Sequence, residues 1–184
     1  MSAEITHLNQ AALPAPSDLE RIELRVNGIR GLTARIYTEN TLPALHRLAG
    51  DVDRALENAA EISAQLDAIQ RPATKKELAN YLSALRIAFP TAKAAGDGFS
   101  RVLIERVAAH TPSFGQLDWA TRRLIDTSQF LPSVAEVLRA LASARQSIEE
   151  ARLFVDPRGL ARLRRQVADR ILEETPTPPP ALAP

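Results

Sequence analysis

A strict pattern of apolar residues between positions 45 and 69 limits the possible folds of this chain more than any other feature. The apolar residues recur at intervals that alternate between four and three, at Leu45, Leu48, Val52, Ala55, Ala59, Ile62, Leu66 and Ile69. Such intervals place every member on one face of an α-helix. Pro43 suits the first turn, where no backbone donor is needed. The pattern therefore predicts one amphipathic helix over residues 42–69, about 40 Å long.

These eight residues, called the 45–69 seam below, allow two kinds of helix packing. The seam can pack against other helices of the same chain, or it can join two copies of the chain in a coiled coil. Val52, Ala55 and Ala59 bury little apolar area, so a dimer held by the seam alone would be weak. We favour packing within the chain and keep a homodimer as the alternative.

The composition favours helices in the rest of the chain as well. Glycine is scarce, with 7 residues in 184, whereas Ala, Leu, Glu and Arg are abundant. The chain is 45% hydrophobic but only 4% aromatic, so its core must be built from aliphatic side chains. The fold class expected is all-α, a multi-helix bundle with a long amphipathic helix and disordered termini.

Prolines and helix-capping residues divide the sequence into segments. Ser17, Thr74 and Ser133 each stand three residues before a glutamate, which is the pattern of a capping box at a helix start. Asp156 before Pro157 marks another start. The segments expected are a disordered arm (1–16), an N-terminal segment with the long helix (17–72), a helical module (73–155), a basic C-terminal helix (156–174) and a disordered Pro-rich tail (175–184).

Residues 17–37 allow two interpretations. Leu19, Ile22, Val26, Ile29 and Ile36 fit a helical stripe behind the Ser17 cap. The same segment also contains two alternating apolar runs around Asn-Gly at 27–28, a hairpin signal. A lone hairpin is marginal unless it is packed on something, and the cap favours the helix.

The stretch from Phe114 to Ala144 is expected to form the centre of the helical module. It contains the only tryptophan, Trp119, on a short helix, then a turn, then a helix opened by Ser133. Burying so large a side chain is strongly favourable. We therefore expect Trp119, Leu124, Phe130 and Val137 to lie together and exclude water.

No motif for catalysis or cofactor binding occurs in the sequence. It contains no P-loop, no dinucleotide-binding glycine pattern, no nucleophile elbow and no cysteine. The three histidines, His7, His46 and His110, lie far apart without the short spacing of zinc ligands. We expect a protein that is not an enzyme and that holds no metal or cofactor.

The helix expected over 156–174 is the one candidate for nucleic-acid contact. Arg158, Arg162, Arg164 and Arg165 lie in its first half. They could bind phosphates or a protein partner, although a single basic helix without aromatic residues is a weak footprint. The net charge of +1 argues against a dominant polyanion-binding surface.

The sequence gives no sign of a membrane protein. No run approaches the roughly 20 apolar residues that span a bilayer, and the start of the chain, Met-Ser-Ala-Glu, lacks the features of a secretory signal. We expect a cytoplasmic protein with no membrane partner.

Residues 74–145 resemble a family of small phage-type replication accessory proteins, of the helicase loader and inhibitor type, and related phage and prophage proteins. The shared layout is a helix ending at Phe89-Pro90, a polar loop, a helix ending near Pro112, a helix with Trp119, and Phe-Leu-Pro-Ser-x-Ala-Glu-Val at 130–137. The resemblance implies a helical module that binds a replicative helicase or an initiator. The segments that precede residue 74 depart from this layout.

The function expected is that of a non-enzymatic, protein-binding accessory factor, with phage or prophage DNA replication as the setting that the resemblance implies. Two alternatives remain. One is a structural or oligomerising coiled-coil protein that uses the 45–69 seam, and the other is a DNA-binding protein that uses the Arg-rich helix.

Overall fold

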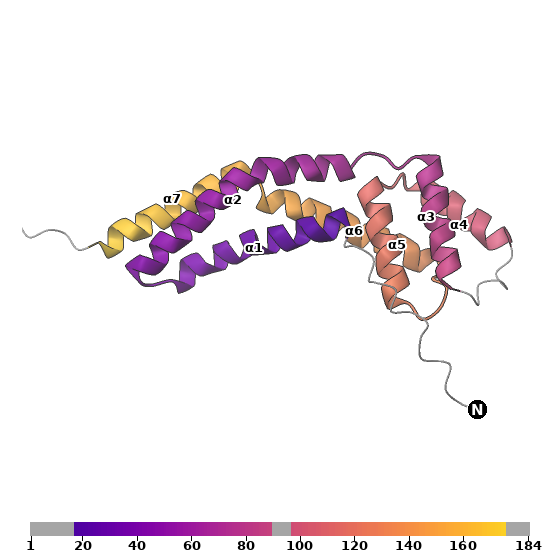
Figure 1. Ribbon diagram of the computed structural model, residues 1–184, viewed down its shortest axis with the longest axis horizontal. Coiled ribbons are helices and arrows are strands. Elements are labelled where there is room, and N and C mark those ends of the chain that lie inside the picture. The colour runs from indigo at the N-terminus through magenta and orange to yellow at the C-terminus, as the bar shows by residue number, and fades with distance from the viewer. Residues whose placement is uncertain (1–16, 90–96, 176–184) are drawn as a thin grey trace, which may run out of the picture.

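The described residues of the computed structural model, 17–89 and 97–175, form seven α-helices and no strand (Figure 1). The helices are α1 (Asp18–Thr38), α2 (Leu42–Ile69), α3 (Lys75–Ala88), α4 (Asp97–Ala109), α5 (Phe114–Thr127), α6 (Val134–Phe154) and α7 (Pro157–Glu174). The all-α prediction is confirmed, and the long helix has the predicted bounds. The expected arm, and the expected tail from residue 176 onward, lie outside the described residues.

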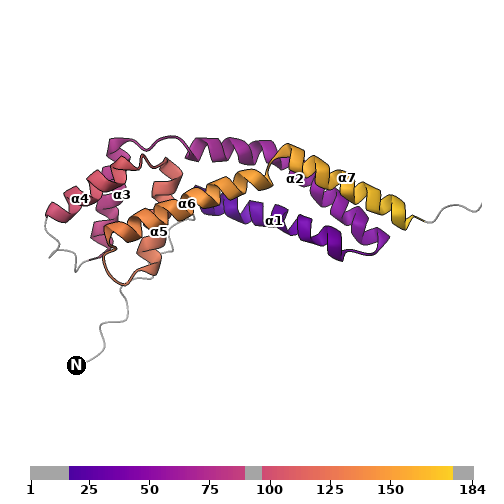
Figure 2. The same cartoon turned by 180° about the vertical axis from the view of Figure 1, so that it is seen from behind.

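Helices α1, α2 and α7 pack side by side at one end of the molecule (Figures 1 and 2). Asp53 on α2 pairs with Arg164 on α7 at 2.5 Å, and Arg170 donates to the Ile36 carbonyl at 3.2 Å. All members of the 45–69 seam are buried within the chain, the most exposed being Ala55 at 7%. The structure therefore has the seam packed within one chain, and leaves no exposed apolar stripe there for a dimer.

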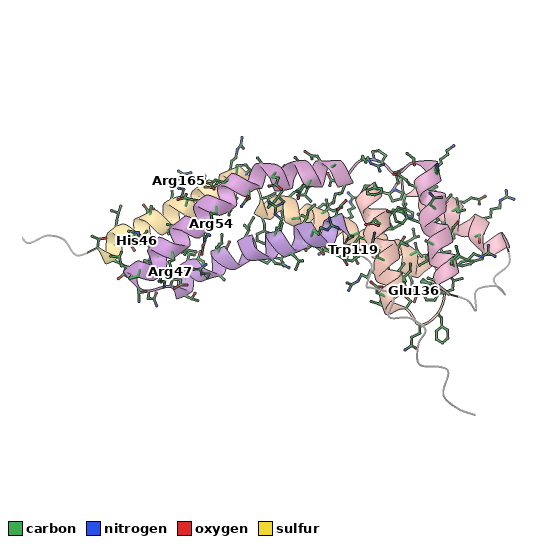
Figure 3. The ribbon with its side chains drawn as sticks, viewed as in Figure 1. His46, Arg47, Arg54, Trp119, Glu136 and Arg165 are labelled. Carbon is green, nitrogen blue, oxygen red and sulfur yellow. The ribbon has the colours of Figure 1, made fainter. Side chains whose placement is uncertain are left out.

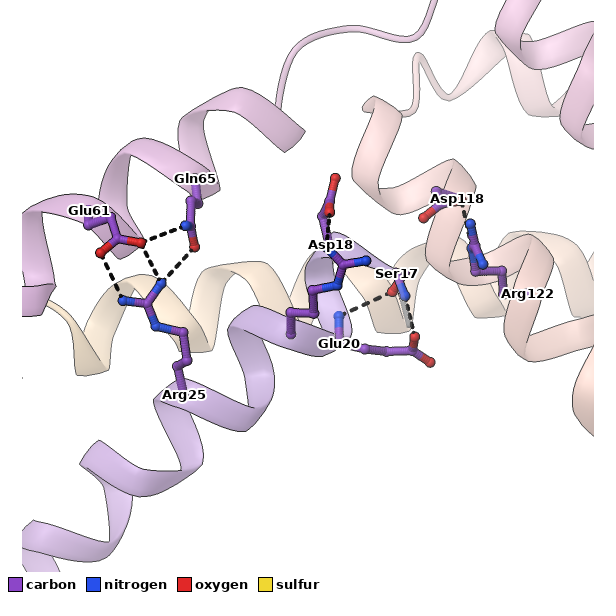
Figure 4. Close-up of polar contacts among 9 residues, drawn as sticks. Ser17, Asp18, Glu20, Arg25, Glu61, Gln65, Asp118 and Arg122 are labelled. Atoms are coloured by element: carbon purple, nitrogen blue, oxygen red, sulfur yellow. Dashed lines mark hydrogen bonds and ion pairs between the residues drawn. The ribbon is translucent and has the colours of Figure 1, made fainter. Parts of the chain in front are cut away.

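Residues 18–38 are helical, so the hairpin alternative for this segment is wrong. Ser17 caps α1 as expected: the Glu20 amide donates to Ser17 Oγ at 3.1 Å, and the Ser17 amide donates to Glu20 Oε2 at 2.6 Å (Figure 4). Apolar side chains on one face of α1 are buried, namely Leu19, Ile22, Val26, Ile29, Leu32 and Ile36. Burial of this whole stripe against the neighbouring helices outweighs the local Asn-Gly turn signal.

Helices α3, α4 and α5 gather at the other end, and α6 runs from this group to α1, α2 and α7 (Figures 1 and 2). The segment between α2 and α3 is hydrogen-bonded to the segment between α4 and α5. The Ala73 amide donates to the Pro112 carbonyl at 3.0 Å, and the Phe114 amide donates to the Arg71 carbonyl at 2.9 Å. These bonds fix the start of α5 beside the end of α2.

One prediction about the centre of the module is wrong. Trp119, Leu124 and Val137 are buried as expected, but 73% of Phe130 is exposed. The turn between α5 and α6 is too short to fold every apolar side chain inward. It buries Pro132 and half-buries Leu131, and the side chain before them points to solvent.

Candidate partner-binding site

A small cavity lies between α3, α4 and the turn that joins α5 to α6. Its volume is about 90 Å³, and its lining consists mainly of apolar side chains with a polar edge: Leu82, Ser83, Arg86, Phe99, Ser100, Leu103, Ile104 and Leu131. Arg86 closes the polar edge by donating to Ser100 Oγ at 3.1 Å. We call this the α3–α4 cavity.

The elements that form the α3–α4 cavity also carry exposed large apolar side chains. Ile104 lines it and is 37% exposed. Phe130, 73% exposed, directly precedes the lining residue Leu131, and Ile87, 79% exposed, directly follows the lining residue Arg86. A cavity with a mainly apolar lining, on elements that also expose large apolar side chains, is typical of a surface that binds another protein.

The turn that carries Phe130 is held at its end by a helix cap. The Glu136 amide donates to Ser133 Oγ at 3.3 Å, and the Ser133 amide donates to Glu136 Oε2 at 2.7 Å. Hydrogen bonds from the Ser133 hydroxyl and amide, and the nearby Arg139, lower the pKa of Glu136. Glu136 therefore stays ionised and keeps the cap closed at neutral pH.

A buried polar cluster fixes the α3 wall of the cavity onto α5. Asp118 is only 6% exposed, and it accepts hydrogen bonds from the Tyr81 hydroxyl at 2.9 Å and from Arg122 Nε at 2.8 Å (Figure 4 shows the Arg122 contact). Burial, and then the bond to Asp118, raises the pKa of Tyr81. The phenol therefore stays neutral and donates its hydrogen bond to Asp118. This contact holds α3, one wall of the α3–α4 cavity, against α5.

A larger cavity of about 360 Å³ opens between α1 and α2, but its charged side chains are already paired. Its charged lining includes Arg21 and Arg25. Arg21 lies 3.6 Å from Asp18, and Arg25 binds Glu61 at 2.9 Å and also Gln65 (Figure 4). Since both arginines have partners, we place the candidate site at the α3–α4 cavity.

The predicted site residues fall into two groups in the structure. The 45–69 seam is buried, whereas the arginines proposed for nucleic-acid or partner contact are all exposed on α7. Arg164 is engaged by Asp53, while Arg158, Arg162 and Arg165 make no ion pair with any described residue. His46 and His110 are exposed on separate segments, and the described part of the chain contains no cluster of three or more metal-ligating side chains.

The sequence interpretation missed most of the α3–α4 cavity. It placed Phe130 in the core and did not connect Tyr81 with Asp118. Two local signals were available. Ser113 stands three residues before Gln116, a capping box that the structure forms, and Asp118 stands four residues before Arg122, the spacing of a helical ion pair.

Comparisons with protein-family models, with curated proteins and with solved structures find no match to this chain. None of the helices within the described residues combines the length and the apolar character needed to cross a bilayer.

Proposed function

We propose that this protein is a non-enzymatic binding factor that holds a segment of a partner protein at the α3–α4 cavity. The observation that carries the proposal is Phe130, a fully apolar side chain that is 73% exposed on a turn whose next residues are packed and capped. A short, fixed turn loses little conformational freedom when a partner covers it. The partner segment presents a bulky aliphatic or aromatic side chain, because the cavity lining is mainly apolar.

The resemblance of residues 74–145 to helicase loader-type proteins supports a more specific form of this proposal. Every residue that lines or surrounds the α3–α4 cavity falls within that range. In this form, the partner is a replicative helicase or an initiator of phage or prophage DNA replication.

The size of the effect can be estimated from the exposed ring. Central aromatic side chains of protein interfaces typically cost about 2 kcal/mol or more when truncated. A loss of about 2 kcal/mol weakens binding about 30-fold. Removal of Phe130 should therefore reduce partner affinity by at least this factor without disturbing the fold, since surface substitutions usually change stability by less than about 0.5 kcal/mol.

The test uses the full chain and two variants as bait in a lysate of the source organism. Phe130→Asp places a charge at the site, and Leu153→Asp makes the same kind of change on α6, where Leu153 is 76% exposed. A partner retained by the parent and by Leu153→Asp but lost by Phe130→Asp, and confirmed by titration of the purified pair, supports the proposal. Equal retention by all three proteins contradicts it.

The homodimer alternative is tested with the same variants. The mass of each protein in solution is measured by light scattering over a range of concentrations. If the parent is a dimer and Phe130→Asp is a monomer, the site is occupied by a second copy of this chain and the proposal of a different partner is wrong. A monomeric parent removes the alternative.

A further inference from the structure

Three arginines form a line along the outer face of α7. Arg158, Arg162 and Arg165 are spaced by four and three residues, so they lie on one side of the helix over about 10 Å. The opposite side carries the buried Leu160, Leu163 and Val167. We call the outward residues the α7 arginine stripe.

The α7 arginine stripe lacks the counter-charges that accompany most other arginines. Arg25 pairs with Glu61 at 2.9 Å, and Arg30 pairs with Glu150 at 3.1 Å. Arg164, within the same stretch of α7, pairs with Asp53 at 2.5 Å. No described acidic residue forms an ion pair with a member of the stripe. Like charges on neighbouring turns repel. A bound anion would relieve the repulsion among these three guanidinium groups.

We infer that the α7 arginine stripe binds the phosphate backbone of a nucleic acid. Guanidinium groups match phosphate oxygens in a two-pronged geometry. A protein ligand would need a buried apolar anchor at the centre of the contact. The one exposed large apolar residue of α7, Leu172, lies on the same face but seven residues beyond Arg165, past the acidic Asp169, so it is at the far end of the face and not at the centre of the stripe. The stripe thus offers what a phosphate backbone needs and lacks what a protein partner needs.

The stripe and the α3–α4 cavity lie in different halves of the molecule. Figure 3 shows Arg165 on the α7 side of the molecule, away from Trp119 and Glu136. Figures 1 and 2 agree on this separation of α7 from α3 and α4. The inference therefore goes beyond the proposed function and does not depend on it.

The test is a titration of fluorescently labelled single-stranded and duplex DNA with the full chain, followed by anisotropy at several salt concentrations. Three phosphate contacts predict that log K falls with log salt at a slope of about −2 for single strands and about −2.7 for duplex. Between 50 and 200 mM salt, this corresponds to losses of about 20-fold and about 40-fold.

Two triple variants separate the stripe from general charge. One carries Arg158→Gln, Arg162→Gln and Arg165→Gln. The control carries Lys75→Gln, Lys76→Gln and Arg106→Gln, which removes the same charge from exposed residues on α3 and α4 that make no ion pair with described residues. The stripe variant should bind at least 10-fold more weakly at low salt, and the control should bind nearly as well as the parent.

Two further measurements check the folding of the variants and the contribution of a single arginine. Circular dichroism and urea unfolding check that both triple variants fold, and the single variant Arg162→Gln should make the salt slope shallower by about 0.7 to 0.9. Equal losses in both triple variants, or no salt-dependent binding by the parent, would overturn the inference. So would binding of poly-glutamate in place of DNA, because the stripe would then serve an acidic protein segment.

Discussion

The crossing of α5 over the end of α2 makes Gly115 a sensitive test of the fold. A Cβ atom built on Gly115 would lie 2.8 Å from Cβ of Ile69 and 3.1 Å from its Cγ1 and Cδ1. Because the closest contact is Cβ to Cβ, a rotamer change of Ile69 cannot relieve it. The two helix backbones must instead move apart, although hydrogen bonds between the flanking connections hold them close.

Two opposing effects decide the outcome of Gly115→Ala. Alanine is favoured over glycine inside helices by up to about 1 kcal/mol. Inserting a methyl group into a closely packed contact costs about 1–3 kcal/mol. The contact at 2.8 Å is tighter than real Cβ contacts, so we expect the steric cost to win and stability to fall by about 1–2 kcal/mol. For a chain of this size the melting temperature should fall by roughly 2–8 °C.

Gly50→Ala is the matched control for this prediction. Gly50 also lies inside a helix, α2, but a Cβ there would have no neighbour within 4 Å. The same substitution should therefore stabilise the protein at Gly50, by up to about 1 kcal/mol, and destabilise it at Gly115. Urea unfolding, followed by circular dichroism and by Trp119 fluorescence, measures both. A rise in stability for Gly115→Ala equal to that for Gly50→Ala would refute the close crossing of α5 and α2.

Three further predictions concern the buried ring, the cavity wall and the α3 cap. Trp119→Ala should cost roughly 3–5 kcal/mol of unfolding free energy, and Phe130→Ala less than about 0.5, because only the first leaves an internal cavity; comparable losses would contradict the assignment of Phe130 to the surface. Tyr81→Phe should cost about 1.5–3 kcal/mol by removing a hydrogen bond to the buried Asp118 carboxylate, and unchanged urea unfolding would show that the cluster does not fix α3. Hydrogen bonds from Arg71 and then Thr74 lower the pKa of Glu77 from 4.5 to about 2. This contribution to stability is full above about pH 4.5 and is lost as the pH falls through about 2. The melting temperature of Glu77→Gln should therefore lie below that of the parent near neutral pH and approach it in acid, and a constant gap would count against the lowered pKa.

The features that could be predicted from the sequence are those set by neighbouring residues. The 45–69 seam depends only on intervals of three and four, and the caps at Ser17, Thr74 and Ser133 depend on a partner three residues away. Such signals depend on residues close in sequence, so tertiary contacts change them little. The segment around Gly28 was ambiguous for the opposite reason, because a helix and a hairpin both satisfied its local pattern.

The candidate site could not be predicted because it depends on contacts between distant segments. Tyr81 and Asp118 are 37 positions apart, and the cavity needs α3, α4 and the α5–α6 turn together. On α7 the sequence pattern could not separate Arg164 from its exposed neighbours Arg158, Arg162 and Arg165. That distinction depends on Asp53, which lies 111 positions away.

Phe130 is the most exposed of the phenylalanines that the structure describes. The chain has only five phenylalanines, and the other four are buried or half-buried. Tyr37 is equally exposed, at 74%, but its hydroxyl group interacts favourably with water, whereas Phe130 has no polar atom in its side chain. Burial of a phenylalanine side chain is worth about 1.5–3 kcal/mol, and the fold gains little of this at position 130. A partner that covers the α3–α4 cavity would recover that free energy on binding, which is why Phe130 is the residue on which the proposed function depends.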